Sequence, residues 1–157
     1  MKKILLVLSI ALTVFNCSSS DEDNSGGAIS DQILTGTVEG RAFTFKGGKA
    51  FITTNFEDEE AISLNLTNVE VGCETFVGDY DLSISAIVPN QVGMHQDINI
   101  VTHQDGESPF NHLGQVLEIT AISNTEVSGK MRLNFPSNDD FFKESIFEGT
   151  FTLTICE

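Results

Sequence analysis

The chain has 157 residues, of which 23 are acidic and eight are basic, so its formal net charge at neutral pH is −15. Nucleic acids and anionic headgroups are held by basic surfaces, and a chain this acidic is therefore not expected to bind either. It contains one tyrosine and no tryptophan, so it lacks the large aromatic platforms that sugar sites commonly use. Beyond its N-terminal region, the length suits one ordinary domain with its own core.

The first 16 residues have the layout of a secretory signal. Lys2 and Lys3 precede an uncharged, mostly apolar run from Ile4 to Phe15. This run is shorter than the roughly 20 residues that a membrane-spanning helix needs. A segment of this kind is removed from the mature protein. Its removal leaves six basic residues against 23 acids, a formal charge of −17.

A single cysteine, Cys17, ends the apolar run. The sequence Val14-Phe15-Asn16-Cys17 resembles a bacterial lipobox. In that family the cysteine becomes the lipidated first residue of the mature chain, so the resemblance implies attachment to a membrane through a lipid on Cys17. The alternative is plain secretion with an unmodified cysteine.

Serines followed by acids come directly after Cys17. The pattern resembles the export signal of surface lipoproteins of the Bacteroidota, and the resemblance implies an outer-membrane location facing the cell exterior. Residues 17–32 are also rich in Ser, Asp, Asn and Gly, a composition that favours a flexible acidic tether. The residues that match the export signal are Ser18, Ser19, Ser20, Asp21, Glu22 and Asp23.

From Ile33 to Glu157, apolar residues recur at every second position. This period is typical of strands with one buried and one wet face. Ile62, Leu64 and Leu66, for example, alternate with polar residues, and short glycine-containing turns separate such runs. The sequence predicts a single all-β domain over residues 33–157 with eight or nine strands. Two arrangements fit, an antiparallel β-sandwich and a small closed β-barrel.

Two cysteines, Cys73 and Cys156, remain in this domain. Outside the inner membrane a pair of cysteines is more often oxidised than free. We therefore expect a disulfide between Cys73 and Cys156, the alternative being two free thiols.

The strand pattern itself carries a second resemblance. The start of the domain is similar to that of small, poorly characterised all-β lipoproteins of the Bacteroidota. This stretch runs from Gly36 to Phe51 and reads G-T-V-E-G-R-A-F-T-F-K-G-G-K-A-F. The two closing segments, E-V-S-G-K-M-R-L-N-F and F-E-G-T-F-T-L-T-I-C, share the likeness. The resemblance implies a fold and a location but brings no catalytic residues.

No metal, cofactor or catalytic residue is predicted. His95 and His103 are eight residues apart, which separates them by about 26 Å on a straight strand and excludes joint zinc binding with Asp97. The acidic stretches Glu57 to Glu60 and Asp139-Asp140 follow no EF-hand pattern, although calcium binding there stays open. Motifs for a nucleophile, a nucleotide loop or a zinc protease are missing from the sequence.

These features favour a non-enzymatic binding or structural module that is held at the membrane by lipid and binds an unknown protein or glycan. A lipocalin-like carrier of a small apolar ligand and a minor hydrolase are the alternatives. Candidate ligand-binding residues are aromatic side chains in loops expected at Gln104 to Gly114 and Pro136 to Lys143: Phe110, Phe141 and Phe142. The competing interpretation is that these rings cap the core.

Overall fold

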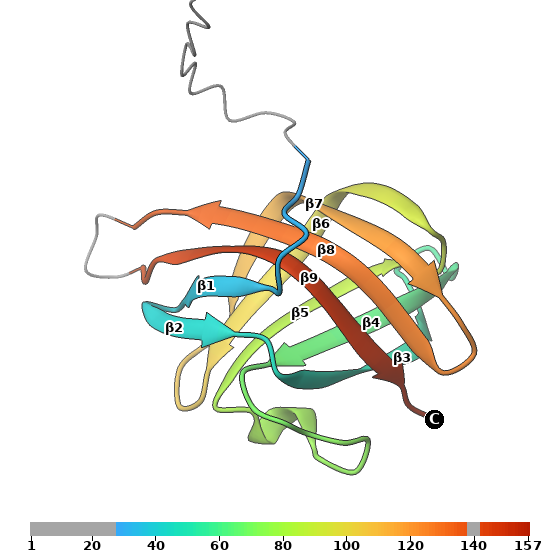
Figure 1. Cartoon of the computed structure of the whole chain (residues 1–157), viewed down its shortest axis with the longest axis horizontal. Helices are drawn as coiled ribbons and strands as arrows, with labels where there is room; N and C mark the ends of the chain where they lie inside the picture. The colour runs from blue at the N-terminus through green and yellow to red at the C-terminus, as the bar shows by residue number, and fades with distance from the viewer. Residues whose placement is uncertain (1–27, 138–141) are drawn as a thin grey trace, which may run out of the picture.

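The computed structural model describes residues 28–137 and 142–157. Within these ranges the chain forms nine strands and one short 3-10 turn, Val77–Asp79 (Figure 1). None of the described residues belongs to a helix long and apolar enough to cross a membrane. Cys17, the export-signal residues and Phe141 lie outside the described residues. The strands are β1 (Thr35–Val38), β2 (Arg41–Thr44), β3 (Gly47–Thr54), β4 (Glu60–Thr67), β5 (Leu82–Pro89), β6 (Gly93–Gln104), β7 (Phe110–Ile122), β8 (Glu126–Phe135) and β9 (Ser145–Ile155).

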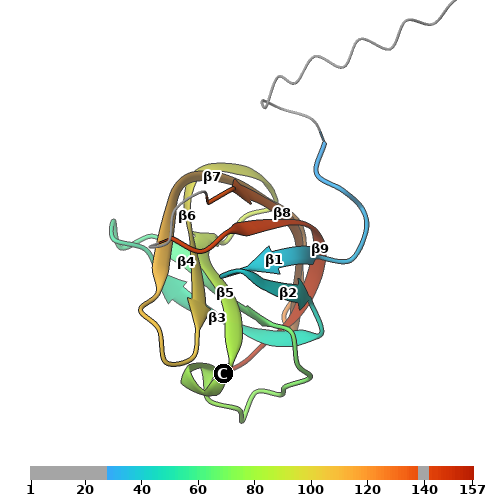
Figure 2. The same ribbon diagram turned by 90° about the vertical axis from the view of Figure 1, so that its left-hand side faces the viewer.

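Seven of these strands close into a barrel. The sheet runs in the order β9-β3-β4-β5-β6-β7-β8, and β8 pairs with β9 again along its whole length (Figure 2). The seam between β3 and β9 is parallel and short, joining Lys49 to Thr154 and Ala50 to Ile155. The β1–β2 hairpin extends the sheet from β9. The all-β prediction is thus confirmed, and of its two arrangements the structure is the barrel.

The barrel interior is packed with side chains from one face of each strand. Ile62, Leu64 and Leu66, whose alternation predicted a strand, are fully buried there. The same holds for alternate positions of β5, where Leu82 and Ile84 point inward. The outward-facing residues between them remain polar or partly exposed, as expected for strands with one wet face. The hydrophobic effect of this filled core is therefore what closes the sheet.

Residues ahead of β1 pack against the outside of β8 and β9. The backbone N–H of Leu34 donates to the Thr150 carbonyl at 2.9 Å, and the Thr150 N–H donates to the Gln32 carbonyl at 2.8 Å. Further upstream, Ile29 is buried. Packing against the barrel therefore includes residues upstream of the boundary expected at Ile33, and the described part of Ala28–Glu157 contains all nine strands.

The long connection between β4 and β5 is tied to the barrel at two points. Cys73 and Cys156 form the predicted disulfide, with their Cα atoms 5.6 Å apart, and so attach the connection to the end of β9. The buried Lys49 ammonium of β3 donates to the carbonyls of Cys73, at 2.7 Å, and Thr75. Both ties lie beside the short seam between β3 and β9, where few ladder hydrogen bonds hold the barrel closed.

Candidate binding groove

Two of the three aromatic residues singled out from the sequence, Phe110 and Phe142, lie together at one end of the barrel. The Phe110 ring lies 5.2 Å from the Phe142 ring and 5.3 Å from the Phe135 ring, measured between centroids. Phe110 is half-buried and Phe142 is 46% exposed. The loop expected at Gln104 to Gly114 is wrong from Phe110 onward, because β7 begins at Phe110. Phe110 packs within this end cluster, whereas Phe142 keeps an open face.

His112 belongs to the same end of the barrel and is buried. Its Nε2 lies 2.9 Å from the Thr102 hydroxyl, which also donates to the Glu39 carboxylate. The rings of Phe110 and Phe135 pack edge-on against the imidazole. Burial away from water disfavours the charged imidazole and lowers the pKa of His112 to about 4. The histidine is therefore neutral at physiological pH and forms part of the packed barrel end.

This burial makes the stability of the barrel depend on pH. An unfolded histidine has a pKa of about 6.5, so the unfolded state binds the extra proton first as the pH falls. We expect the His112 contribution to be intact above pH 6.5 and to be lost progressively towards pH 4, by up to about 3 kcal/mol. Urea unfolding of wild type and His112→Gln at pH 7 and pH 4.5 isolates this contribution. A stability difference between the two proteins that does not change with pH would contradict it.

Histidine and acidic side chains do not gather into a metal-binding group within the described residues. His112 lies inside the barrel end, while the His95 ring contacts the Gln91 carbonyl at 2.8 Å on the surface. Within residues 28–137 and 142–157, no group of three or more His, Cys, Asp or Glu side chains is placed to hold a metal ion. Asp139 and Asp140 lie outside these ranges.

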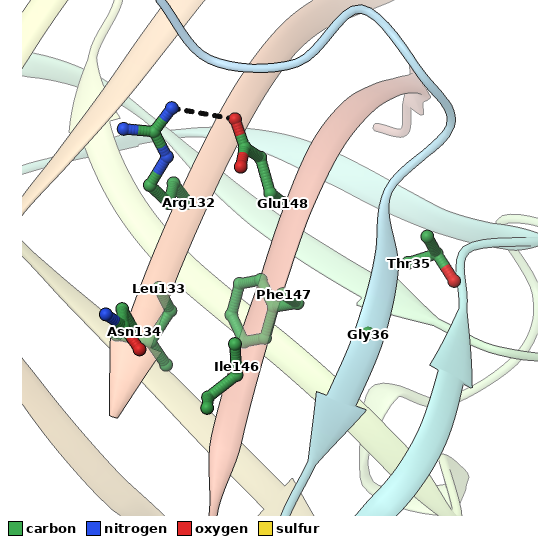
Figure 3. Close-up of a pocket in the computed structure, with 8 residues that line it drawn as sticks. All are labelled: Thr35, Gly36, Arg132, Leu133, Asn134, Ile146, Phe147 and Glu148. Carbon is green, nitrogen blue, oxygen red and sulfur yellow. Dashed lines mark hydrogen bonds and ion pairs between the residues drawn. The ribbon is translucent and has the colours of Figure 1, made fainter. Parts of the chain in front are cut away.

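A first hollow, of about 500 Å³, lies on the outer wall formed by β1, β8 and β9. Figure 3 shows Arg132 and Glu148 facing each other across β8 and β9, 2.7 Å apart. The Arg132 guanidinium also donates to the Ala28 carbonyl, and the Ser30 N–H donates to the Glu148 carboxylate. The hydrogen bond from Arg132 lowers the pKa of Glu148. Both charged groups are therefore already bonded to other groups of the chain. The hollow lies where the N-terminal segment joins the barrel.

A second hollow, of about 480 Å³, lies on the outer wall formed by β4, β5 and β6. We call it the β4–β6 groove. Its lining combines outward-facing side chains of these strands with Ala86 and Ile98, two residues of the buried core. Asp97 is the one charged side chain among the described residues that line it. The lining residues are Thr54, Asn55, Phe56, Ser63, Asn65, Ser85, Ala86, Ile87, Asp97, Ile98, Asn99 and Val101.

Phe56 stands at the rim of this groove and is fully exposed. It sits in the turn between β3 and β4, which the side chain of Asn55 organises. The Asn55 carbonyl oxygen accepts from the N–H groups of Glu57 and Glu59, both at 2.9 Å, and its amide donates to the Glu59 carboxylate. These bonds hold the turn in shape without burying the phenyl ring. A ligand in the groove that covers the ring would remove its apolar surface from water, so the ring can serve as a contact point.

Asp97 is placed by an irregularity in β6. The register between β6 and β7 shifts on either side of Ile98. Asp97 itself has a positive φ of 57°, a conformation that Asp adopts more readily than most residues. Its side chain is exposed and forms no ion pair within the described residues. The groove thus holds a carboxylate whose charge no neighbouring side chain neutralises.

The rest of the floor combines polar and apolar groups. The side-chain amide of Asn99 donates to the side-chain carbonyl oxygen of Asn111 at 2.8 Å. The side-chain carbonyl oxygen of Asn99 is buried and has no partner within the described residues. Ser63 accepts from the Asn65 amide at 3.3 Å. Beside these polar groups, Ile87 is 47% exposed. The surface can therefore form hydrogen bonds and apolar contacts together, as small-ligand and peptide sites do.

The groove and the N-terminal attachment occupy opposite walls. Around the barrel, β5 is three strands from β8 in one direction and three strands from β9 in the other. A ligand bound to β4, β5 and β6 would therefore lie on the other side of the barrel from the segment between Ala28 and β1.

Sequence reasoning missed this groove. Phe56 interrupts an otherwise acidic and polar loop, and that interruption was an available signal. The rest of the lining could not be predicted from the sequence, because serines and asparagines are common on the solvent-exposed face of any sheet. Comparison with known proteins found no matching family model and no significant match among curated proteins or solved structures.

Proposed function

We propose that the protein is a lipid-anchored, non-enzymatic binding module on the outer face of the outer membrane, and that it binds its ligand in the β4–β6 groove. The N-terminal region carries the proposed anchor at Cys17 and the acidic tether that follows it. The domain from Ala28 onward carries the groove. Each part supplies one half of the function, attachment and recognition.

The observation that carries the proposal is the fully exposed Phe56 ring at the rim of a groove of about 480 Å³. The volume falls within the usual range of ligand sites, roughly 300 to 1,000 Å³. A fully exposed phenylalanine held by a well-bonded turn adds a large apolar contact area at low entropic cost. Apart from Asp97 the lining offers no ionisable group, and this favours binding over catalysis.

The placement of the groove suits display from a membrane. Because the N-terminal segment joins the β8–β9 wall, a tether drawn towards the membrane would turn that wall inward. The β4–β6 wall, on the other side of the barrel, would then face outward. The geometry is consistent with a surface module and requires no rearrangement for ligand access.

The carrier alternative receives less support. A lipocalin-like carrier holds its ligand inside the barrel, where a cavity must remain. Here the interior is filled by buried side chains such as Phe43, Phe147 and Leu117. Both hollows described above lie on the outer walls instead.

Attachment is tested by replacing the proposed lipid site. Cys17→Ser should abolish labelling by palmitate analogues and release the protein from the membrane fraction, because no other thiol lies near the apolar run. Ser18→Ala is the matched control and should remain labelled. A Cys17→Ser protein that is still labelled and still sediments with membranes would contradict the proposal.

Surface display is tested separately. Changing Asp21, Glu22 and Asp23 to Ala should leave lipid labelling unchanged but reduce cleavage by protease added to intact cells. The acids belong to the proposed export signal and not to the lipid site, so the two readouts should separate. Equal protease access for wild type and the triple variant would show that these acids do not direct export.

A further inference from the structure

The β4–β6 groove carries negative charge that the protein leaves unpaired. Arg41, Lys130, Arg132 and Lys143 form ion pairs elsewhere with carboxylates, and Lys49 is buried against backbone carbonyls. None of these five cations lines the groove, and neither does Lys46, the remaining basic residue of the described chain. Any positive charge that complements the groove must therefore come from the ligand.

Two features of the lining point to the kind of cation. Asp97 offers a carboxylate, and Phe56 offers an exposed aromatic face in the same groove. Arginine matches both, because its planar guanidinium stacks on aromatic rings and binds a carboxylate through two parallel hydrogen bonds. The acids Glu57 to Glu60 follow Phe56 directly and add negative potential at that end.

The floor suits a peptide backbone beside such a side chain. Ser63 and Asn65 on β4, Ser85 on β5 and Asn99 on β6 place hydroxyl and amide groups along three neighbouring strands. Peptide N–H and C=O groups are the natural partners of these side chains. The volume of about 480 Å³ accommodates one long side chain and a short extended segment.

We infer that the β4–β6 groove binds an extended segment of a partner protein through one arginine, whose guanidinium lies between Phe56 and Asp97. The inference rests on the proposed function and specifies its ligand. Electrostatic attraction to the groove and its acidic rim speeds encounter, and the guanidinium contact gives specificity. A neutral glycan could use the same amides and hydroxyls but would leave the Asp97 charge unused.

The test uses residues 28–157 and pairs of probe peptides. The blocked peptide Ala-Ala-Arg-Ala-Ala is compared with its citrulline counterpart, which has the same shape without the charge, and with the neutral sugar maltotriose. Binding is followed by amide chemical shifts in two-dimensional NMR. We expect the arginine peptide to shift groove residues and to bind about 10-fold more tightly than the citrulline peptide.

Variants locate the contacts. Asp97→Asn removes the charge but keeps a residue that tolerates positive φ, and should weaken the arginine peptide about 10-fold. Phe56→Ala should weaken it about 5-fold. The matched controls are Asp105→Asn and Phe76→Ala, both at exposed positions outside the groove, and they should bind as wild type does. Unchanged melting temperatures exclude unfolding as the cause.

Four results would overturn the inference. One is equal binding of the arginine and citrulline peptides, and another is peptide shifts confined to residues outside the groove. The third is binding of maltotriose in the groove without binding of the peptide, which would leave the proposed function in place and replace its ligand. If none of the probes shifts groove residues, the arginine inference fails, while the attachment experiments on Cys17 stand on their own.

Discussion

Replacing Cys73 and Cys156 together by serine is expected to lower the free energy of unfolding of residues 28–157 by about 4 kcal/mol. The disulfide spans 83 positions of sequence. Cross-linking so distant a pair removes conformational entropy from the unfolded chain, and the chain-entropy estimate of about 4 to 5 kcal/mol is an upper value. Because small domains are stable by roughly 5 to 15 kcal/mol, this loss is a large share of the total.

Urea unfolding at pH 7 measures the effect, and wild type under reducing conditions serves as the control. Reduced wild type and the double serine variant should unfold at similar urea concentrations, well below that of oxidised wild type. The loss of stability should be greatest at the seam between β3 and β9. The Cys73–Cys156 disulfide anchors the β4–β5 connection beside this short pairing. Coincident midpoints for the oxidised and serine proteins would contradict this account of barrel closure.

Gly48→Ala is expected to destabilise the barrel by about the same amount, roughly 4 kcal/mol. Gly48 has a φ of 149°, which side chains rarely adopt, and this costs about 1 to 3 kcal/mol. An added Cβ would also lie 2.1 Å from the Asn65 carbonyl oxygen and 3.0 Å from the Leu66 Cα. Those atoms belong to the backbone of β4, so the two strands must separate, which adds about 1 to 3 kcal/mol.

Gly93→Ala is the matched control for this prediction. Gly93 has a similar φ of 140°, but a Cβ there would meet no atom within 4 Å. It should therefore show only the backbone cost, about 1 to 3 kcal/mol, without the additional cost of separating two strands. Thermal or urea unfolding of the two variants separates the cost of the steric contact with β4 from the cost of the backbone conformation. If they lose equal stability, the close approach of β3 and β4 at Gly48 is not what requires glycine there.

The strands could be predicted from sequence because burial on one face imposes a period of two. Ile62, Leu64 and Leu66 displayed that period and are buried as expected. The closed barrel could not be distinguished from a sandwich, since both bury one face of every strand. The difference lies in the pairing of β3 with β9, two residue pairs joined across most of the chain. No local pattern encodes such a contact.

The start of β7 was mistaken for a loop for a physical reason. Phe110 and His112 point inward at even positions, whereas Leu117 and Ile119 do so at odd positions. The parity changes around Gly114, which has a φ of 71°, and the register with β6 shifts in the same region. A bulge of this kind breaks the period of two, so a single strand resembles a turn followed by a shorter strand.

The disulfide was predictable from composition and compartment, but the groove was not. Its recognition surface combines an exposed ring from the β3–β4 turn, one aspartate from a bulge in β6 and small polar residues from three strands. Phe56 and Asp97 are far apart in sequence, and only the curvature of the barrel brings them to one wall. Of the three phenylalanines favoured from sequence, Phe110 and Phe142 lie instead at the barrel end, and Phe141 lies outside the described residues.

A combined array of peptides and glycans tests most directly whether the β4–β6 groove is the binding surface. Residues 28–157 are applied to the array as wild type, as Phe56→Ala and as Phe76→Ala, which removes an exposed ring outside the groove. We expect the ligands of wild type to be retained by Phe76→Ala and to bind Phe56→Ala about 5-fold or more weakly. Equal binding of all three proteins to the same ligands would contradict it and move the binding surface to another part of the barrel.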